Sequence, residues 1–175
     1  QRRDQWFADV ERGDEKAIYR SLGQKPLTDF RGDKYEWVTM TASDGRTAFI
    51  VAAAAGHVAA LRLLAGHGAD VLAKDSAGEN ALHAATVHNH IQAMHYLVTE
   101  LHVPIDSPNP SLKSPLHKAV DAGHLQAMKL LLELKADVNL VDKYKTTSLV
   151  HATKHAKHDA CALLRERYWL GGVRA

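Results

Sequence analysis

The sequence is poor in cysteine, proline and aromatic residues: it has one cysteine, five prolines and 6% aromatic side chains among 175 residues. Because Cys161 is alone, an internal disulfide and a paired-cysteine zinc or redox motif are excluded, and a reducing compartment, cytoplasmic or nuclear, is favoured. The most apolar run, residues 48–55, is far shorter than the ~20 residues that span a bilayer. We therefore expect a soluble domain with an ordinary packed core and no membrane insertion.

Neither sign of charge dominates the whole chain, since it has 22 Lys and Arg against 20 Asp and Glu. The net charge is 0 over residues 1–40, −3 over residues 41–110 and +5 over residues 111–175. The basic C-terminal third makes nucleic-acid binding one alternative function. Its Lys and Arg residues lack the tight clustering and interleaved aromatic residues of nucleic-acid surfaces, so an ordinary solvated face is favoured.

An internal repeat with a spacing of 33 or 34 residues organises the chain. The segment Gly-Arg-Thr-Ala-Phe-Ile at 45–50 aligns with Gly-Glu-Asn-Ala-Leu-His at 78–83, with Ser-Pro-Leu-His at 114–117 and with Thr-Ser-Leu-Val at 147–150. Four copies are therefore visible. Further along, the copies also align at Gly56-His57, Asn89-His90, Gly123-His124 and the degraded Ala156-Lys157, and at Leu63-Leu64, Leu97-Val98, Leu131-Leu132 and Leu163-Leu164.

Each copy predicts two short helices. In the third copy, apolar residues recur at helical spacing over residues 116–120, Gly123 interrupts the pattern, and residues 125–132 resume it. Ser114 followed by Pro115 is a favourable helix start, because the hydroxyl can cap the helix and proline loses no needed donor at the first position. A helical hairpin of this kind cannot bury its apolar residues alone, so it must stack on its neighbours.

The combined pattern closely resembles the ankyrin repeat, whose copies read Gly-x-Thr-Pro-Leu-His-x-Ala, then Gly-His, then Leu-Leu, then Gly-Ala-Asp-Val-Asn. The resemblance covers residues 42–168, with a weaker N-terminal unit at residues 6–22. It implies an all-α solenoid of stacked helical hairpins joined by extended, β-turn-like fingers. We expect a capping helical unit with a long aromatic-containing loop at 1–41, and repeats at 42–74, 75–108, 109–141 and 142–175, the last with the C-terminal cap.

The end copies depart from the family pattern. Ile50 and Val150 stand where the motif histidine belongs, and Lys145 stands where a turn glycine is usual. For His83 and His117, which match the motif, the resemblance implies hydrogen bonds between neighbouring turns. We therefore interpret these two histidines as structural rather than catalytic.

The sequence offers one tempting metal-binding set, His151, His155, His158 and Cys161, which are zinc-ligand types. On one continuous helix they would point to a common side, and a metal site or metal-dependent enzyme is therefore the alternative function. The repeat register opposes it, because Ala156 aligns with Gly123 and predicts a turn within the set. The chain has no glycine-rich phosphate loop and no nucleophilic triad, so we expect no catalytic residue, no cofactor and no small-molecule substrate.

A protein-binding surface is the remaining candidate, since the concave face of such stacks binds another protein or peptide. The family's binding positions map onto exposed turn and first-helix residues whose charge changes from acidic or neutral to basic along the stack. We therefore expect a monomeric scaffold or adaptor domain whose partner segment has an acidic end near Lys143, Lys154 and His155. The predicted residues are Ser43, Asp44, Arg46, Ser76, Glu79, Val87, His88, Ser111, Lys113, Asp121, Lys143, Tyr144, Thr146, Lys154 and His155.

The long loop near residues 24–40 adds Tyr35 and Trp37. These two aromatic residues have two interpretations: they pin the loop onto the stack, which is favoured, or they extend the contact surface as a binding hot spot.

Overall fold

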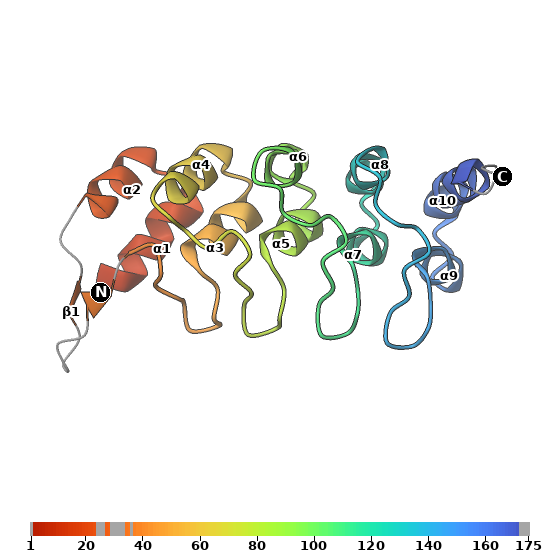
Figure 1. Cartoon of the computed structure of the whole chain (residues 1–175), viewed down its shortest axis with the longest axis horizontal. Coiled ribbons are helices and arrows are strands. Elements are labelled where there is room, and N and C mark those ends of the chain that lie inside the picture. Colours follow the sequence, from red (N-terminus) through yellow and green to blue (C-terminus); the bar gives the residue numbers. More distant parts are fainter. Residues whose placement is uncertain (1, 24–26, 29–33, 36, 172–175) are drawn as a thin grey trace.

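A computed structural model describes residues 2–23, 27–28, 34–35 and 37–171, with side chains described up to residue 166 outside the two short strands. Ten helices in this part of the chain form five antiparallel pairs in a single row, with the chain termini at opposite ends (Figure 1). The helices are α1 (Arg2–Arg12), α2 (Glu15–Leu22), α3 (Ala48–Ala55), α4 (Val58–Gly66), α5 (Ala81–Val87), α6 (Ile91–Thr99), α7 (Pro115–Ala122), α8 (Leu125–Glu133), α9 (Ser148–Lys154) and α10 (His158–Gly171).

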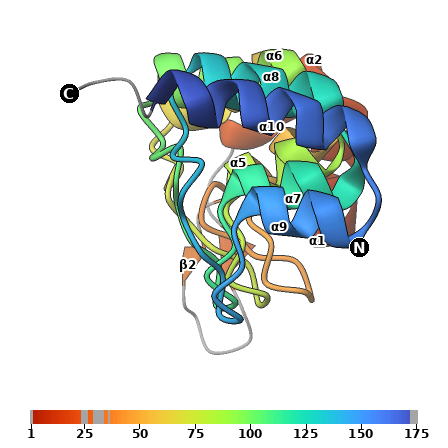
Figure 2. The same cartoon turned by 90° about the vertical axis from the view of Figure 1, so that its right-hand side faces the viewer.

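The pairs stack so that like helices adjoin. The inner helices α1, α3, α5, α7 and α9 pack in sequence, as do the outer helices α2, α4, α6, α8 and α10. Figure 2 looks along the row and shows these two layers, with the loops between successive pairs projecting together beyond the inner layer. The predicted all-α repeat architecture is confirmed. A small exception is the antiparallel pair of two-residue strands β1 (Leu27–Thr28) and β2 (Lys34–Tyr35), with Leu27 opposite Tyr35.

The core runs the length of the stack between the two layers. Its side chains come from the periodic apolar positions of both helices of each pair, and burial of each removes apolar surface from water. The largest fully buried ones in the three central pairs are Phe49, Ile50, Leu61, Leu64, Leu82, Met94, Leu97, Leu116, Met128 and Leu131.

The inner helices begin at the predicted caps. Thr47 and Thr147 accept hydrogen bonds from the third residue of α3 and α9 through their side chains. Asn80 and Ser114 each form a reciprocal capping box, with His83 and His117 as the returning side chain. The motif histidine therefore stabilises the start of its own helix.

The outer helices α4, α8 and α10 each begin next to a side chain that reaches back to the previous pair. His57 Nε2 lies 2.9 Å from the carbonyl oxygen of Glu11, and His124 Nε2 lies 2.8 Å from that of Val87. At the aligned position in the last pair, Lys157 Nζ donates to the carbonyls of Val120 and Asp121, both at 2.6 Å. Lysine thus replaces histidine in the degraded copy and keeps the link, and its charge suits the carboxyl end of α7.

The turn within each pair has a residue in the left-handed backbone region. These residues are Gly13, Gly56, Asn89, Gly123 and Ala156, with φ between 51° and 76°. The turn predicted at Ala156 is confirmed, and it separates His155, which ends α9, from His158, which starts α10.

Candidate protein-interaction surface

Four loops between successive pairs share one tip geometry, and we name them fingers 1 to 4 by their tips, residues 42–46, 75–79, 109–113 and 142–146. In each finger the backbone amide of the first tip residue donates a hydrogen bond to the carbonyl oxygen of the fifth, for example from Asp142 N to Thr146 O at 3.0 Å. The backbone amide of the fourth tip residue donates to the carbonyl oxygen of the first, and the fourth residue has a positive φ. The fingers therefore present equivalent positions side by side along the stack.

An aspartate or asparagine at the first tip position builds fingers 2 to 4. Asp75 Oδ1 accepts the amides of Ala77 and Glu79, and Asn109 Oδ1 accepts the corresponding amides of finger 3. Asp142 Oδ1 does the same in finger 4 and also accepts the Thr146 hydroxyl. These side chains shape the tips and leave the following positions to vary.

The motif histidines connect neighbouring fingers. His83 Nε2 lies 3.2 Å from the carbonyl oxygen of Lys113, and His117 Nε2 lies 3.2 Å from that of Thr146. Both rings are fully buried, and burial lowers the pKa of each. They are therefore neutral side chains that hold the fingers in register, as the resemblance implied.

Several predicted contact residues lie on the expected surface but are paired with each other. Glu79 is bonded to Lys118 at 2.6 Å and to Asn109 at 3.1 Å, and these bonds outweigh burial and lower the pKa of Glu79. Lys113 is bonded to Asp121 at 2.5 Å. The Glu79–Lys118 pair bridges adjacent copies, whereas Lys113 and Asp121 belong to the same copy. In both cases the side chains have structural partners of their own.

The first finger has a similar local pair. Arg46 Nε lies 2.6 Å from Asp44 Oδ2, and the Arg46 amide also donates to Asp44, which lowers the pKa of Asp44. The carbonyl of Asp44 accepts the amide of Ser76, which joins fingers 1 and 2. Ser43 and Ser76 are exposed at the tips.

At the C-terminal end of the surface, the predicted contact residues are exposed and form the fewest ion pairs with other side chains of the stack. Tyr144 is the most exposed large apolar side chain in the described part of the chain, at 69%, and Lys143 Nζ lies 5.0 Å from its ring centroid. Lys154 and His155 are exposed at the end of α9, as is His88 at the end of α5. Val87, Ser111 and Thr146 are only partly accessible.

A charged network between α7, finger 4 and α9 was not predicted from the sequence. His151 Nδ1 lies 3.0 Å from Asp121 Oδ1, and His151 Nε2 lies 2.9 Å from Asp142 Oδ2. In each contact a ring nitrogen that carries a proton can donate to the carboxylate oxygen. One signal was available in the sequence. His151 takes the helix position of Lys118, so a nitrogen-bearing side chain that can donate a hydrogen bond recurs there in successive copies.

The two carboxylates in this network are held in the ionised form. Burial would raise the pKa of Asp142, but hydrogen bonds from His151, Thr146 and Tyr144 outweigh it and hold that pKa far below its usual range. Burial also opposes ionisation of Asp121, and Lys113 and His151 outweigh it and lower its pKa. The network therefore fixes both the base of finger 4 and the position of Lys113.

The proposed metal set does not assemble. His151 is occupied by two carboxylates, and the turn at Ala156 places His155 and His158 on different helices. Cys161 is buried and free. Among the residues that the structure describes, no group of three or more His, Cys, Asp or Glu side chains is arranged so that it could hold a metal ion.

Trp37 is not an exposed contact residue. Its side chain is only 6% accessible and its ring lies 5.6 Å from that of Trp6 in α1, so it packs the loop onto the first helix pair. Trp37 is therefore corrected from a partner-binding residue to a core residue. The side chain of Tyr35 lies outside the described residues.

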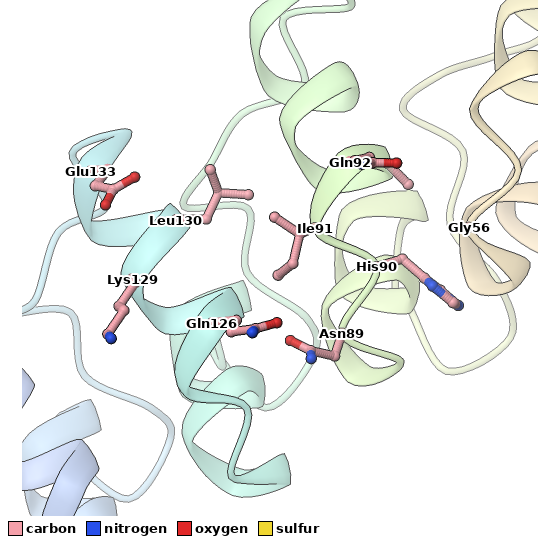
Figure 3. A pocket seen from close by; sticks show the side chains of 10 residues that line it. Gly56, Asn89, His90, Ile91, Gln92, Gln126, Lys129, Leu130 and Glu133 are labelled. Carbon is pink, nitrogen blue, oxygen red and sulfur yellow. The ribbon is translucent and has the colours of Figure 1, made fainter.

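An open groove of about 590 Å³ lies in the outer layer between α6 and α8 (Figure 3). Ile91 and Leu130 face each other across it, and Lys129 and Glu133 at its edge contribute one charge of each sign. None of the predicted contact residues lines this groove. It is therefore separate from the surface formed by the fingers and inner helices.

No helix among the described residues combines the length and the apolar character needed to cross a membrane.

Comparison with known proteins agrees with this repeat architecture. A family model described as ankyrin repeats (3 copies) matches residues 10–109 and 98–169. The chain is 31% identical over 113 residues to the ankyrin repeat protein FPV223 of Fowlpox virus (strain NVSL), covering 65% of this chain and 78% of that protein. Members of the family are generally protein–protein interaction modules and are typically non-enzymatic.

Other relatives are much longer than the matched region. The B-cell lymphoma 3 protein homolog of Mus musculus is 34% identical over 108 residues, covering 59% of this chain and 24% of that protein. Palmitoyltransferase AKR1 of Eremothecium gossypii is 36% identical over 71 residues, covering 41% of this chain and 10% of that protein. The chain thus spans a quarter or less of the length of these two relatives. Since the family model and the viral relative each cover most of its length, the chain belongs to the ankyrin repeat family.

Proposed function

We propose that this domain is a non-catalytic interaction module that binds a partner protein along the surface formed by the fingers and the inner helices, in the cytoplasm or nucleus. The observation that carries the proposal is the contrast along this surface. Toward the N-terminal end the charged side chains are paired within the stack, as in Asp44–Arg46 and Glu79–Lys118. At the C-terminal end Tyr144 and Lys154 are exposed.

The charge at this end supports a partner segment with an acidic end. The carboxylates near finger 4 are already engaged, because Asp142 is buried and bonded to His151, and Asp121 is bonded to Lys113 and His151. The cations Lys143 and Lys154 therefore face the solvent without a nearby free carboxylate in the described residues to offset them. Complementary charge increases the association rate and selects among partners more than it increases affinity.

The test is a triple substitution, Tyr144→Ser, Lys154→Ala and His155→Ala, with binding to an affinity-purified partner measured by calorimetry. We expect at least a tenfold loss of affinity, because an exposed aromatic residue at an interface contributes about 1–2 kcal/mol on truncation and the lost charge adds to it.

The matched control substitutes three exposed residues of the outer helices, Tyr19→Ser, Lys129→Ala and His95→Ala, and should leave the affinity unchanged. Unchanged affinity in the first variant, with its helical circular dichroism intact, would reject this location for the binding surface.

A further inference from the structure

Two fingers carry bulky side chains where the backbone favours glycine. The fourth tip position has φ of 77° at Gly45 and 71° at Gly78, but it is Leu112 in finger 3 and Lys145 in finger 4, with φ of 56° and 58°. A side chain in this left-handed region costs free energy that glycine avoids. The Leu112 side chain is 52% exposed, so the core gains little from it. Folding alone does not account for a leucine at this position.

The same two fingers concentrate exposed apolar surface. Of six large apolar side chains exposed in the described residues, Leu112, Val141 and Tyr144 lie in or beside fingers 3 and 4. The two tips are joined, because the amide of Lys143 donates to the carbonyl of Ser111 at 3.0 Å. Figure 1 shows the loops before α7 and α9 as neighbours that project on the same side of the stack. Leu112 and Tyr144 are thus the residues that come directly after Ser111 and Lys143, the two residues joined by this hydrogen bond.

The charge around this apolar surface is positive. Lys143 and Lys145 flank Tyr144 and are exposed, and Lys143 Nζ lies 5.0 Å from the Tyr144 ring centroid. The one carboxylate of the finger 4 tip, Asp142, is buried and accepts four hydrogen bonds. An approaching ligand therefore meets lysine and apolar side chains without a competing free carboxylate at the tip.

We propose that the tips of fingers 3 and 4 form a docking patch for an acidic peptide segment with one apolar anchor side chain, which seats beside Leu112 and Tyr144 while its carboxylates face Lys143 and Lys145. This inference rests on the proposed function and specifies the partner's chemistry. A nucleic acid fits less well, because Leu112 and Val141 offer neither charge nor a hydrogen-bond donor to a phosphate backbone. Backbone strain retained at an exposed position is a recurrent feature of binding sites.

The experiment separates stability from binding with Leu112→Gly, used alone to measure stability and together with Tyr144→Ser to measure binding. It restores the residue type of fingers 1 and 2, so the unfolding midpoint should rise or stay constant. The probe is a phage-displayed library of random peptides selected on the intact domain. We expect selected peptides rich in Asp and Glu around an apolar residue, and at least tenfold weaker binding of them to the Leu112→Gly/Tyr144→Ser variant. Ala156→Gly, which relieves a left-handed residue outside the fingers, is the matched control and should leave binding unchanged.

Each outcome decides a specific point. Peptides that bind the domain and the double variant equally, or that lack acidic residues, would overturn the docking patch while leaving a binding surface elsewhere on the domain. A fluorescent oligonucleotide that binds and is lost on the same substitutions would also overturn it in favour of nucleic acid. No selected peptide at all, together with unchanged affinity of the Tyr144→Ser/Lys154→Ala/His155→Ala variant for a purified partner, would reject the proposed function itself.

Discussion

The joint between α3 and α5, at the start of the regular repeats, is built differently from the joint between α7 and α9 at the end. In the first joint Ile50 occupies the motif histidine position, and α3 buries all six of residues 48–53. The last joint contains the buried ring of His117, the imidazole of His151 between Asp121 and Asp142, and the ammonium group of Lys157 on the carbonyls of α7. The same fold thus joins its copies by apolar packing at one end and by polar and ionic bonds at the other. The two joints should respond to different perturbations.

The largest effect is expected in the apolar joint. Ile50→Ala should lower the free energy of unfolding by about 3 kcal/mol, because it removes fully buried methyl groups and leaves a cavity. Urea unfolding measures this loss. It should be nearly the same at low and high salt and between pH 6 and pH 8, since no charge is involved. A strongly salt-dependent loss would break the comparison.

The ionic joint gives the next largest effect. His151→Ala should cost about 2 kcal/mol, because Asp142 is left buried with one bond fewer, while the partly exposed Asp121 is screened by solvent.

The destabilisation should be greatest in α9, the helix that carries His151. Hydrogen exchange of the α9 amides, followed in both proteins, locates the change. Equal protection of these amides in both proteins would contradict the assignment.

Acid should destabilise the protein through the buried motif histidines His83 and His117. The pKa of His83 and of His117 is lowered in the folded protein, so the unfolded chain takes up the proton first. Their contribution to stability is complete above about pH 6.5 and falls as pH decreases below that value. The carboxylates Asp121 and Asp142, whose pKa is also lowered, lose their contribution only at pH below about 3.8.

Urea midpoints measured from pH 7 to pH 5 test this order. A midpoint that stays constant over this range would show that protonation of the two buried rings does not oppose folding.

The smallest effect concerns the turn of the last pair. Ala156→Gly should stabilise the protein by about 0.5 kcal/mol, because relief of the left-handed alanine at φ 51° slightly exceeds the added flexibility of the unfolded chain. The matched control is Ala162→Gly, an exposed alanine inside α10, which should destabilise by about 1 kcal/mol. Thermal unfolding of both variants should therefore shift in opposite directions, and shifts of the same sign would contradict the backbone explanation.

Most of the fold could be predicted from the repeat period, because every copy must stack on its neighbours in the same way. The helix starts at Thr47, Asn80, Ser114 and Thr147, and the turn at Ala156, follow from one alignment of the sequence with itself. The α1–α2 pair was also visible from its short helical pattern. Local chemistry and a common register were sufficient there.

The pairing between copies was less predictable. Glu79 and Lys118 are 39 residues apart, and their ion pair depends on how finger 2 approaches α7 of the next copy. From the sequence, His151 had a role only in the alternative metal set, because its carboxylate partners lie on two other segments. The burial of Trp37 depends on contact with Trp6, more than a helix pair away in sequence. Side-chain partners across the stack follow from three-dimensional register, which periodicity alone does not give.

The backward links of the outer helices also give the stack a direction. His57, His124 and Lys157 each supply the donor, and the preceding pair supplies the carbonyl oxygens. At the aligned position in the first pair stands Asp14, which caps its own helix by accepting the amide of Ala17. The stack thus has two unlike ends, as a polar filament has, and a grafted hairpin needs different chemistry at each. After α10 it should bring a histidine or lysine, whereas before α1 it need only offer carbonyls, provided that Asp14 is first changed to a donor.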